Sequence, residues 1–541
     1  MKFKKFVRSL FRDKIHTSWL IAGGCAGFLG GAGAAILPET AIFAGWIFLI
    51  LSGAVMLLVF ASRLKIMMIF VVSAGILFGL WRGTAARVDL NDYKNFIGQN
   101  VVVRGKVKED PDFGQSHDLR VRLIDIEMIL VSERERLNGE VDNIREYFTP
   151  MGGEIWASVS ARGTEVKRSD MIEIGGKLRT GFGTFPASMS FAKLKNVERS
   201  PDADPARDVR DAFGEKLREV IPPPAVDLGM GILAGQKTAL PFDLTAAFIA
   251  ASLTHIVVAS GYNLTILIRF ARRLFAKISR FAAFSFSALL VIAFACVTGF
   301  SPSMTRASLV AGLSLLAWYY GRKFHPVVLL TTVAAMTILI NPVAIWGDAG
   351  WYMSFLSFAG VIILAPLVKD YFWGNEVEMR TKPTLMQKIR TKILPQKSDK
   401  KLEDFGEKEH NFRGIFIETL SAQIMAAPII ALFMGQFSPY GLLANILVLP
   451  IVPLAMLLTF ISGVAAFILP ASLAQIIAMP ATWLLNYIVG VAKFVAELPG
   501  ASQTLEINSW WYAGIFLLIV MAIIYMKIKT KHDFRGDNVA E

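Results

Sequence analysis

Apolar runs of near twenty residues recur along the chain, each long enough to cross a bilayer as a helix. About 20 residues at 1.5 Å of rise each span a hydrocarbon core of about 30 Å. The pattern therefore predicts a polytopic α-helical membrane protein with about twelve spans. The predicted spans lie near 18–37, 41–60, 65–82, 243–267, 281–299, 303–320, 326–341, 350–368, 415–434, 441–468, 474–496 and 508–527.

Between the third and fourth predicted spans, residues 84–200 alternate apolar and polar positions as β-strands do. Val, Ile and Thr are frequent, and Gly or Pro clusters separate the runs. Five strands in a region of this length predict a small all-β domain of the OB type, with a β-sandwich fragment as the alternative. A charged insertion at 132–148 is predicted to form a helix. The strand-like runs are 100–107, 118–131, 153–160, 171–179 and 190–197.

Residues 201–227 connect the β domain to a second membrane region. The sequence PDADP opens this linker, the pattern near 206–220 predicts an amphipathic helix, and IPPP closes it. The second membrane region, 228–528, is interrupted by loop 369–413, whose charges of both signs predict a flexible hairpin. The remaining parts are a three-span region at 1–83 and a tail at 529–541.

The charge distribution predicts the orientation of the spans. The 541-residue chain is 54 % hydrophobic, its mean hydropathy is +0.50 and its net charge is +13. Lys and Arg collect at the N-terminus, after the spans that end near 267 and 320, in loop 369–413 and in the tail. With the N-terminus in the cytoplasm, every one of these clusters is cytoplasmic, as the positive-inside rule expects. Residues 84–240 then lie outside, and the basic balance reflects topology more than a nucleic-acid partner.

The outer region carries almost no net charge, since residues 84–210 hold 20 Lys and Arg against 21 Asp and Glu. Phosphate contacts need Lys or Arg, so this balance predicts weak, salt-sensitive binding of single strands at best. Both cysteines, Cys25 and Cys296, fall in predicted spans, which leaves the outer domain without a disulfide framework. The basic and apolar N-terminal run lacks a clean cleavage site and is expected to remain as an anchor.

The stretch from His255 to Leu264, HIVVASGYNL, places polar residues inside a long apolar run. Polar groups at membrane depth usually line a cavity or a path. A helix break there is tolerated only where protein or water satisfies the freed backbone groups. His255, the Ser260-Gly261 pair and Asn263 are therefore candidate residues of a polar path. A satisfied kink between two packed helices, with a hydrogen-bonded structural histidine, is the alternative.

Further polar residues recur at apparent membrane depth, namely Arg306, Asp348, Ser354, Gln423 and Asn445. An arginine at the bilayer centre costs about 2.5–3.5 kcal/mol on insertion scales, so Arg306 is expected to pair with an acid or to face water. Asp348 is the candidate partner. The accumulation of such residues favours an aqueous path, and interhelical hydrogen bonds of roughly 0.6 kcal/mol each that only hold the bundle are the alternative.

The sequence shows no motif of nucleotide or metal chemistry. GILAGQKT at 231–238 resembles a phosphate-binding loop, but three residues separate its glycines and Gln236 precedes Lys237. The six histidines form no HxxxH motif and no cluster with metal-ligand spacing. We therefore expect no catalytic residue, no metal and no cofactor.

An ordered set of motifs resembles the ComEC-type competence proteins, the DNA-internalisation channels of natural transformation. HIVVASGYNL is followed by TGFSPSMTRA at 298–307, NP at 341–342, DAGWYMSF at 348–355 and a proline-rich motif at 421–453. Together the motifs cover roughly 228–470, and the early spans with a small outer β domain match the family more loosely. The positions that match those of the family are His255, Ser260, Gly261, Arg306, Asp348, Gly350, Ser354, Phe355, Pro428, Asn445 and Pro450.

The resemblance implies an inner-membrane channel that passes single-stranded DNA into the cytoplasm. A DNA receptor would deliver the strand, the outer domain would receive it by aromatic stacking, and a separate cytoplasmic motor ATPase or helicase would supply the force. The sequence departs from many relatives at Asn263, where they carry a second histidine, which weakens any mechanism that needs a histidine pair. Many members also continue into a metallo-β-lactamase-like domain. No HxHxDH motif follows the last predicted span, so a nuclease is expected to be a separate protein or absent.

Two other classes of protein fit parts of the pattern. A secondary transporter or lipid translocator could use His255, Arg306 and Asp348, but carriers often have broken helices in corresponding halves. The break at Ser260-Gly261 has no evident counterpart in the sequence. A membrane-embedded hydrolase needs a nucleophile with a nearby base, and Ser260 has only His255, five residues earlier.

Overall fold

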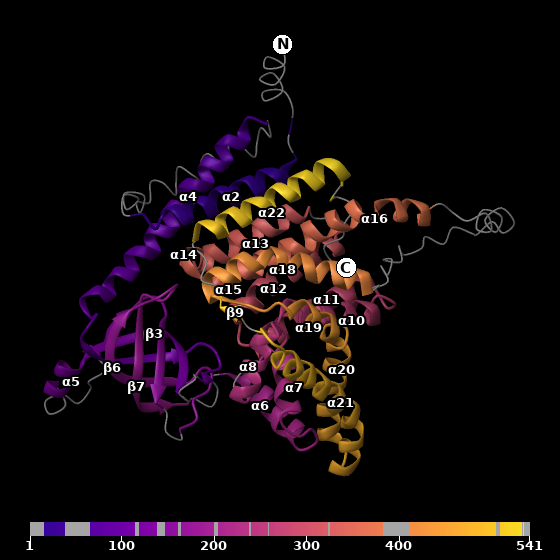
Figure 1. Cartoon of the computed structure of the whole chain (residues 1–541). Coiled ribbons are helices and arrows are strands. Elements are labelled where there is room, and N and C mark those ends of the chain that lie inside the picture. Colours follow the sequence, from indigo (N-terminus) through magenta and orange to yellow (C-terminus); the bar gives the residue numbers. More distant parts are fainter. Residues whose placement is uncertain are drawn as a thin grey trace.

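The chain folds into a bundle of apolar helices with a β domain beside it (Figure 1). The β domain lies between α4 (Met67–Asn91) and α6 (Pro205–Arg218) in the sequence. The structure is a computed structural model. It describes residues 14, 16–37, 53, 65–113, 118–137, 147–160, 164–199, 204–236, 240–257, 259–322, 325–381, 412–501, 503–504, 509–532 and 534.

Two N-terminal helices, α2 (Thr17–Ala34) and α4, pack with their backbones in contact. A side chain added at Gly79 would overlap the carbonyl oxygen of Phe28. Small residues let membrane helices approach this closely, so that van der Waals packing holds them together. The glycines repeat every four residues on both helices, at Gly23, Gly27 and Gly31 on α2 and at Gly75, Gly79 and Gly83 on α4.

The β domain is a ring of five strands. β1 (Asn100–Val107) pairs with β3 (Leu119–Leu130) and with β6 (Met171–Thr180), both antiparallel. β3 pairs with β5 (Ile155–Ser160), which runs parallel to β7 (Ala187–Glu198), and β7 returns to β6 to close the ring. All five predicted strands are present. Two short strands, β2 (Asp112–Phe113) and β4 (Thr149–Met151), add to β3.

Alternate side chains of the ring strands fill its interior. Val101 and Val103 of β1 and Leu123 of β3 are fully buried, as are Ile172 and Ile174 of β6. The period of two that predicted these strands thus also predicts which side chains form the core.

The segments that flank the ring differ in detail from prediction. α4 continues to Asn91, past the boundary predicted at residue 83. The charged insertion begins as the predicted helix, α5 (Val131–Leu137), and residues 138–146 lie outside the described residues. In the linker, α6 is the predicted amphipathic helix. It starts behind Asp204, whose side chain accepts the backbone N–H of Arg207.

The second membrane region holds the remaining helices. Six helices of the described part of the chain are long and apolar enough to cross a membrane, and the bent pair α19–α20 makes a seventh if it is one span. The chain is therefore a membrane protein. Its helices here are α7 (Ala225–Ala234), α8 (Phe242–Ala250), α9 (Thr254–Val257), α10 (Gly261–Phe275), α11 (Arg280–Val297), α12 (Pro302–Tyr319), α13 (Pro326–Ile340), α14 (Ala344–Gly347), α15 (Ala349–Ala359), α16 (Ala365–Thr381), α18 (Phe412–Met434), α19 (Gly441–Val448), α20 (Val452–Ile468), α21 (Ala471–Ala496) and α22 (Ser509–Thr530).

The span predicted at 243–267, with a break at Ser260-Gly261, is interrupted twice. The segment forms three helices, because Ser252 takes a left-handed backbone with φ of 57° after α8 and a second interruption precedes α10. The sequence predicted the second interruption but not the first. Helix α16 also continues to Thr381, into the segment predicted as loop 369–413. The predicted span at 41–60 and residues 382–411 lie outside the described residues, apart from residue 53.

Replacing Gly79 by Leu should separate α2 from α4, because the new side chain would meet the backbone of Phe28. Overpacking of this kind costs about 1–3 kcal/mol or more, so we expect a lower thermal midpoint for the purified protein in detergent. Gly30→Leu is the matched control, since a side chain at Gly30 has nothing within 4 Å. Equal destabilisation by the two substitutions would contradict a role for the close contact.

Candidate functional site

Two interrupted helical segments contact each other in the second membrane region. The first is α8–α9–α10, and the second is α19–α20, which bends by 50° at a break that contains Pro450. The hydroxyl of Tyr262, at the start of α10, donates to the carbonyl of Leu449 in that break at 3.2 Å. The hydroxyl of Ser438, just before α19, donates to the carbonyl of Ala250 at the end of α8 at 2.5 Å. Each segment thus satisfies a backbone group that the other leaves free.

The start of α19 contacts the first interruption of the first segment. A β-carbon at Gly441 would lie 2.7 Å from the β-carbon of Ser252 and 3.4 Å from Nε2 of Gln423. Asn445 is buried, its Nδ2 donates to the Gly441 carbonyl at 2.9 Å, and its Oδ1 has no partner among the described residues. Gln423 and Asn445 were both predicted from the sequence. Gln423 of α18 lies next to Gly441 at the start of α19, and Asn445 lies one turn further along α19.

The polar residues of HIVVASGYNL have different surroundings. His255 is exposed on α9. Asn263 is 1 % exposed, and its Nδ2 donates to the carbonyl of Ile232 in α7 at 2.9 Å. The bond from Asn263 ties α7 to α10, which is the interhelical role that the sequence analysis held as an alternative. Of His255 and Asn263, only His255 has an exposed side chain.

Ser260 and Gly261 mark the start of α10. The Ser260 carbonyl accepts the N–H of Leu264 at 3.2 Å, and a β-carbon at Gly261 would lie 3.2 Å from that of Ala307 on α12. Since Ala307 adjoins Arg306, this contact brings the interrupted segments next to a second group of predicted residues.

That second group surrounds Gly350. Arg306 is 7 % exposed, and its Nη2 donates to the Gly350 carbonyl at 3.1 Å. Two acids interact electrostatically with Arg306: Asp348 of the bundle and Glu109 of the β domain. The expected partner, Asp348, thus acts on Arg306 at longer range, and the direct contact is with the Gly350 backbone. Asp348 joins α14 to α15, where its carbonyl accepts the N–H groups of Trp351 and Tyr352.

The remaining motif residues are packing positions. Phe355 is buried on α15, with its ring 4.8 Å from that of Trp351. Pro428 is buried inside α18, which packs against α15. Ser354 is half-buried on α15. Pro450 is exposed in the α19–α20 break.

The β domain meets the membrane bundle beside the Arg306 group. A β-carbon at Gly183, in the β6–β7 loop, would lie 3.5 Å from the carbonyl oxygen of Gly347, next to Asp348. On the same domain, Arg122 pairs with Glu109 at 3.3 Å. Glu109 also interacts electrostatically with Arg306 of α12, so the charges of the barrel and of the bundle are coupled at this junction.

Aromatic side chains cluster at the same junction. The ring centroid of Phe182, next to Gly183, lies 5.4 Å from that of Trp156 and 5.5 Å from that of Phe185. The Arg122 guanidinium lies 5.5 Å from the centroid of Phe185. Phe182 is 52 % exposed. We call Trp156, Phe182 and Phe185, with Arg122, the junction aromatic group.

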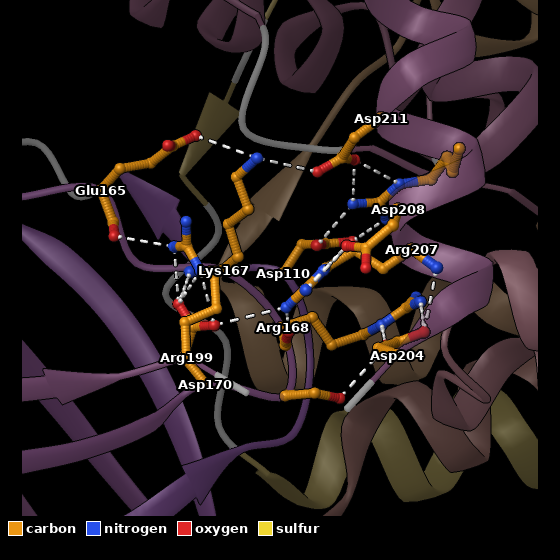
Figure 2. A network of polar contacts seen from close by, with 12 residues as sticks. Asp110, Glu165, Lys167, Arg168, Asp170, Arg199, Asp204, Arg207, Asp208 and Asp211 are labelled. Atoms are coloured by element: carbon orange, nitrogen blue, oxygen red, sulfur yellow. Dashed lines mark hydrogen bonds and ion pairs between the residues drawn. The ribbon is translucent and has the colours of Figure 1, made fainter. Parts of the chain in front are cut away.

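Helix α6 is bound to the barrel by ion pairs that we call the ionic clasp (Figure 2). Arg207 and Arg210 have side chains that are 2 % exposed, and they reach Asp170 at 3.3 Å and Asp110 at 3.0 Å. Buried arginines need such partners, because an unpaired buried charge is strongly destabilising. The ionic clasp comprises Asp110, Glu165, Lys167, Arg168, Asp170, Arg199, Asp204, Arg207, Asp208, Arg210 and Asp211.

Arg168 extends the ionic clasp to the bundle. Its guanidinium donates to both carboxylate oxygens of Asp204, at 2.7 and 3.0 Å. It also donates to the carbonyls of Val297 at 3.0 Å and Cys296 at 3.4 Å, which end α11. A β-carbon at Gly299 would overlap this guanidinium. The barrel is therefore joined to the turn that opens TGFSPSMTRA.

Two carboxylates of the ionic clasp have lowered pKa values. Burial raises the pKa of Asp204, but hydrogen bonds from the Arg168 side chain and the Arg207 backbone outweigh burial and hold it below its ordinary value. Burial likewise raises the pKa of Asp211, and Arg210 with Lys167 lowers it by more. Both acids are therefore stabilised in their charged forms.

A family model described as Competence protein matches residues 232–530, more than half of the 541 residues. The chain belongs to the competence protein family. The matched range contains both interrupted segments and the Arg306 group, which supports the resemblance to ComEC-type proteins and a role in DNA uptake during transformation. The β domain and the ionic clasp precede it. No curated protein and no solved structure matches the chain.

Several residues of this competence protein that build the site were not singled out from the sequence. Tyr262 lies within a quoted motif, and an aromatic hydroxyl beside a helix break is a signal that could have found it. Arg168 carries no such signal, because its partners at residues 296 and 297 are far away in the sequence. In the described ranges, no group of three or more His, Cys, Asp or Glu side chains is placed to hold a metal ion.

The ionic clasp of this competence protein should weaken in acid. Asp204 and Asp211 have folded-state pKa values below the unfolded value of about 3.9 for Asp. Their contribution is therefore complete above about pH 4 and is lost as the pH falls through the folded-state values. Spin labels at Lys195 of the barrel and Ala212 of α6, both exposed, should show a narrow distance distribution at pH 7 that broadens below pH 4.

The variant Asp204→Asn supplies the control for this pH effect. It removes the charge that Arg168 binds, so we expect part of the broadening already at pH 7. A distance distribution in the unmodified protein that stays narrow as the pH is lowered until both carboxylates are protonated would contradict the assigned role of these carboxylates.

Proposed function

We propose that this competence protein is an inner-membrane channel that passes single-stranded DNA into the cytoplasm. The observation that carries the proposal is the position of the junction aromatic group, beside the Arg306 group where the barrel meets the bundle. Aromatic side chains stack on every base, which suits a conduit for DNA of any sequence. A strand stacked there would lie next to the matched family region.

The barrel topology supports an OB-type domain. A five-stranded ring with Greek-key order, in which the third and fifth long strands run parallel, fits such a barrel. Trp156 lies on β5 and Arg122 on β3, two neighbouring strands of this ring. OB-type domains bind oligonucleotides on one face of the barrel, so this placement supports a strand-binding role.

The two interrupted segments support a polar path through the bundle. Non-helical backbone at membrane depth is tolerated where it is buried in protein or lines a water-filled cavity. His255 remains accessible on α9 next to the first break, and Gln423 lies beside the second segment. We propose that His255, Ser260, Arg306, Asp348 and Gln423 face the path, whereas Asn263 and Asn445 hold its wall.

We propose twelve spans, with both termini and loop 369–413 in the cytoplasm and the barrel outside. In Figure 1, α16, which leads toward that loop, leaves the bundle on the side away from the barrel. This arrangement agrees with the positive-inside pattern of the Lys and Arg clusters.

Cysteine labelling in intact cells tests this orientation. A membrane-impermeant thiol reagent should fail to label Leu385→Cys and should label Lys195→Cys on the barrel, in chains whose Cys25 and Cys296 are replaced by Ser. Labelling at position 385 from outside would overturn the proposed topology.

The proposed channel needs partners. Single-stranded DNA is the substrate and the lipid bilayer the environment. We propose that a DNA receptor delivers the strand, that a separate cytoplasmic motor ATPase or helicase pulls it, and that any nuclease is a separate protein. The sequence offers no NTPase motif through which the chain itself could couple energy.

A secondary transporter or lipid translocator is the second candidate function. It is favoured by the side-by-side arrangement of two discontinuous segments joined through Tyr262 and Leu449, which resembles the broken helices of carriers. Such a protein would not need the junction aromatic group.

The functional test compares two exposed aromatic positions. Phe182→Ala removes the centre of the junction aromatic group, whereas Phe191→Ala changes a 70 % exposed residue of β7 outside it. One stacking contact is worth about 1–3 kcal/mol, so we expect Phe182→Ala to lower uptake of labelled single strands about tenfold or more and Phe191→Ala to leave it near normal. Membrane levels of both variants should be unchanged.

Normal DNA uptake in cells whose sole copy is Phe182→Ala together with Trp156→Ala would contradict the channel proposal. It would favour the transporter, whose substrate is not stacked at the junction.

A further inference from the structure

An aromatic residue outside the junction aromatic group has an unfavourable backbone conformation. Phe300, in the turn between α11 and α12, has φ of 51° and is 57 % exposed. Residues with bulky side chains rarely adopt a left-handed backbone, and they keep it only where the surrounding structure fixes it. The exposed Phe191 of β7 has a similar φ of 55°, so the conformation alone assigns no role; what distinguishes Phe300 is the buried arginine beside its turn.

The turn around Phe300 is fixed from several sides. The Phe300 N–H donates to the Ala295 carbonyl at 2.9 Å, and the Thr305 hydroxyl donates to the Phe300 carbonyl at 3.0 Å. Gly299, with φ of 72°, leaves the space that the Arg168 guanidinium occupies. Arg168 in turn binds the carbonyls of Cys296 and Val297 at the end of α11.

The barrel thus contributes the buried cation that holds this turn. Arg168 is locked by Asp204, and its side chain is 3 % exposed. Phe300 lies six residues before Arg306 of α12, in the α11–α12 turn whose Gly299 contacts the Arg168 guanidinium of the barrel. The backbone that carries the Phe300 ring is therefore held next to the barrel by Arg168.

We propose that Phe300 stacks on a nucleobase of the incoming strand and that Arg168 is its positioning residue. This inference rests on the proposed function and adds a contact on the bundle side of the junction. A lipid contact would be met by any large apolar side chain and would not need a turn fixed by a buried arginine. Stacking requires a planar ring at a defined orientation.

Photocrosslinking tests the stacking contact directly. Full-length protein in nanodiscs is mixed with a single-stranded oligonucleotide that contains 5-iodouracil, irradiated, and mapped by peptide mass spectrometry. We expect crosslinks at Phe300 and at the junction aromatic group. Phe300→Leu should lower the affinity for the oligonucleotide about tenfold, within the range of one stacking contact, and Phe300→Tyr should restore both the affinity and the crosslink.

The positioning role of Arg168 has its own variants. Gly299→Ala should displace the guanidinium, and Arg168→Gln should remove its bonds to Asp204 and α11; both should reduce crosslinking at Phe300 at least several-fold while crosslinks at Trp156 persist. Arg199→Gln is the matched control, because it removes an ion pair to Asp170 within the ionic clasp without touching α11. It should leave the Phe300 crosslink unchanged.

The outcomes separate this inference from the proposed function. If Phe300→Leu binds and crosslinks like the unmodified protein while Trp156 or Phe182 still crosslinks, Phe300 is an apolar membrane contact and the stacking inference is wrong. If no residue of the unmodified protein crosslinks, the channel proposal itself fails. A Phe300 crosslink that survives both Gly299→Ala and Arg168→Gln overturns the positioning role alone.

Discussion

Satisfaction of free carbonyl groups at helix ends is the constraint on which the membrane bundle depends. The last four carbonyls of a helix lack intrahelical partners, and hydrocarbon offers them no water. At several helix ends, a side chain from a distant segment donates a hydrogen bond to such a carbonyl. The pairs are Arg82 with Leu339 and Ile340, Trp346 with Ala32, Arg280 with Trp318, Asn263 with Ile232, Tyr262 with Leu449, Ser438 with Ala250, and Arg168 with Cys296 and Val297. A helix end at membrane depth therefore requires a donor, and the fold supplies it from a distant part of the chain.

This constraint explains why one motif can hold both structural and accessible residues. In HIVVASGYNL, Asn263 donates to a carbonyl of α7 and Tyr262 to a carbonyl of the α19–α20 break, whereas His255 has an exposed side chain. Interhelical hydrogen bonding thus accounts for Asn263 and Tyr262, and the polar path remains our proposal for His255. Arg306 has both kinds of interaction. It donates a hydrogen bond to the Gly350 carbonyl, and the charges of Asp348 and Glu109 act on its guanidinium.

Much of the fold could be predicted from the sequence because its signals are local. Periods of two predicted the ring strands, and apolar length predicted helices such as α21. The site was predicted less well, because its contacts join remote residues. Arg168 and Val297 are 129 positions apart, and neither differs from an ordinary loop or helix residue. The first interruption of 243–267 was missed because its left-handed residue is Ser252 and not a glycine, so the local sequence does not mark the turn.

The arginines of the ionic clasp also bear on how a nearly neutral outer domain could handle DNA. Arg168, Arg207 and Arg210 are buried against acids, so they are not available to phosphates. Binding to the barrel would then depend on stacking more than on charge, and it would be weak, with a salt dependence set by the Lys and Arg side chains that remain exposed. Conduction needs sites that admit a substrate and also release it. A barrel whose Arg168 holds the α11–α12 turn, and whose exposed side chains at the junction are aromatic, would meet that requirement better than a strongly basic barrel, which would retain the DNA.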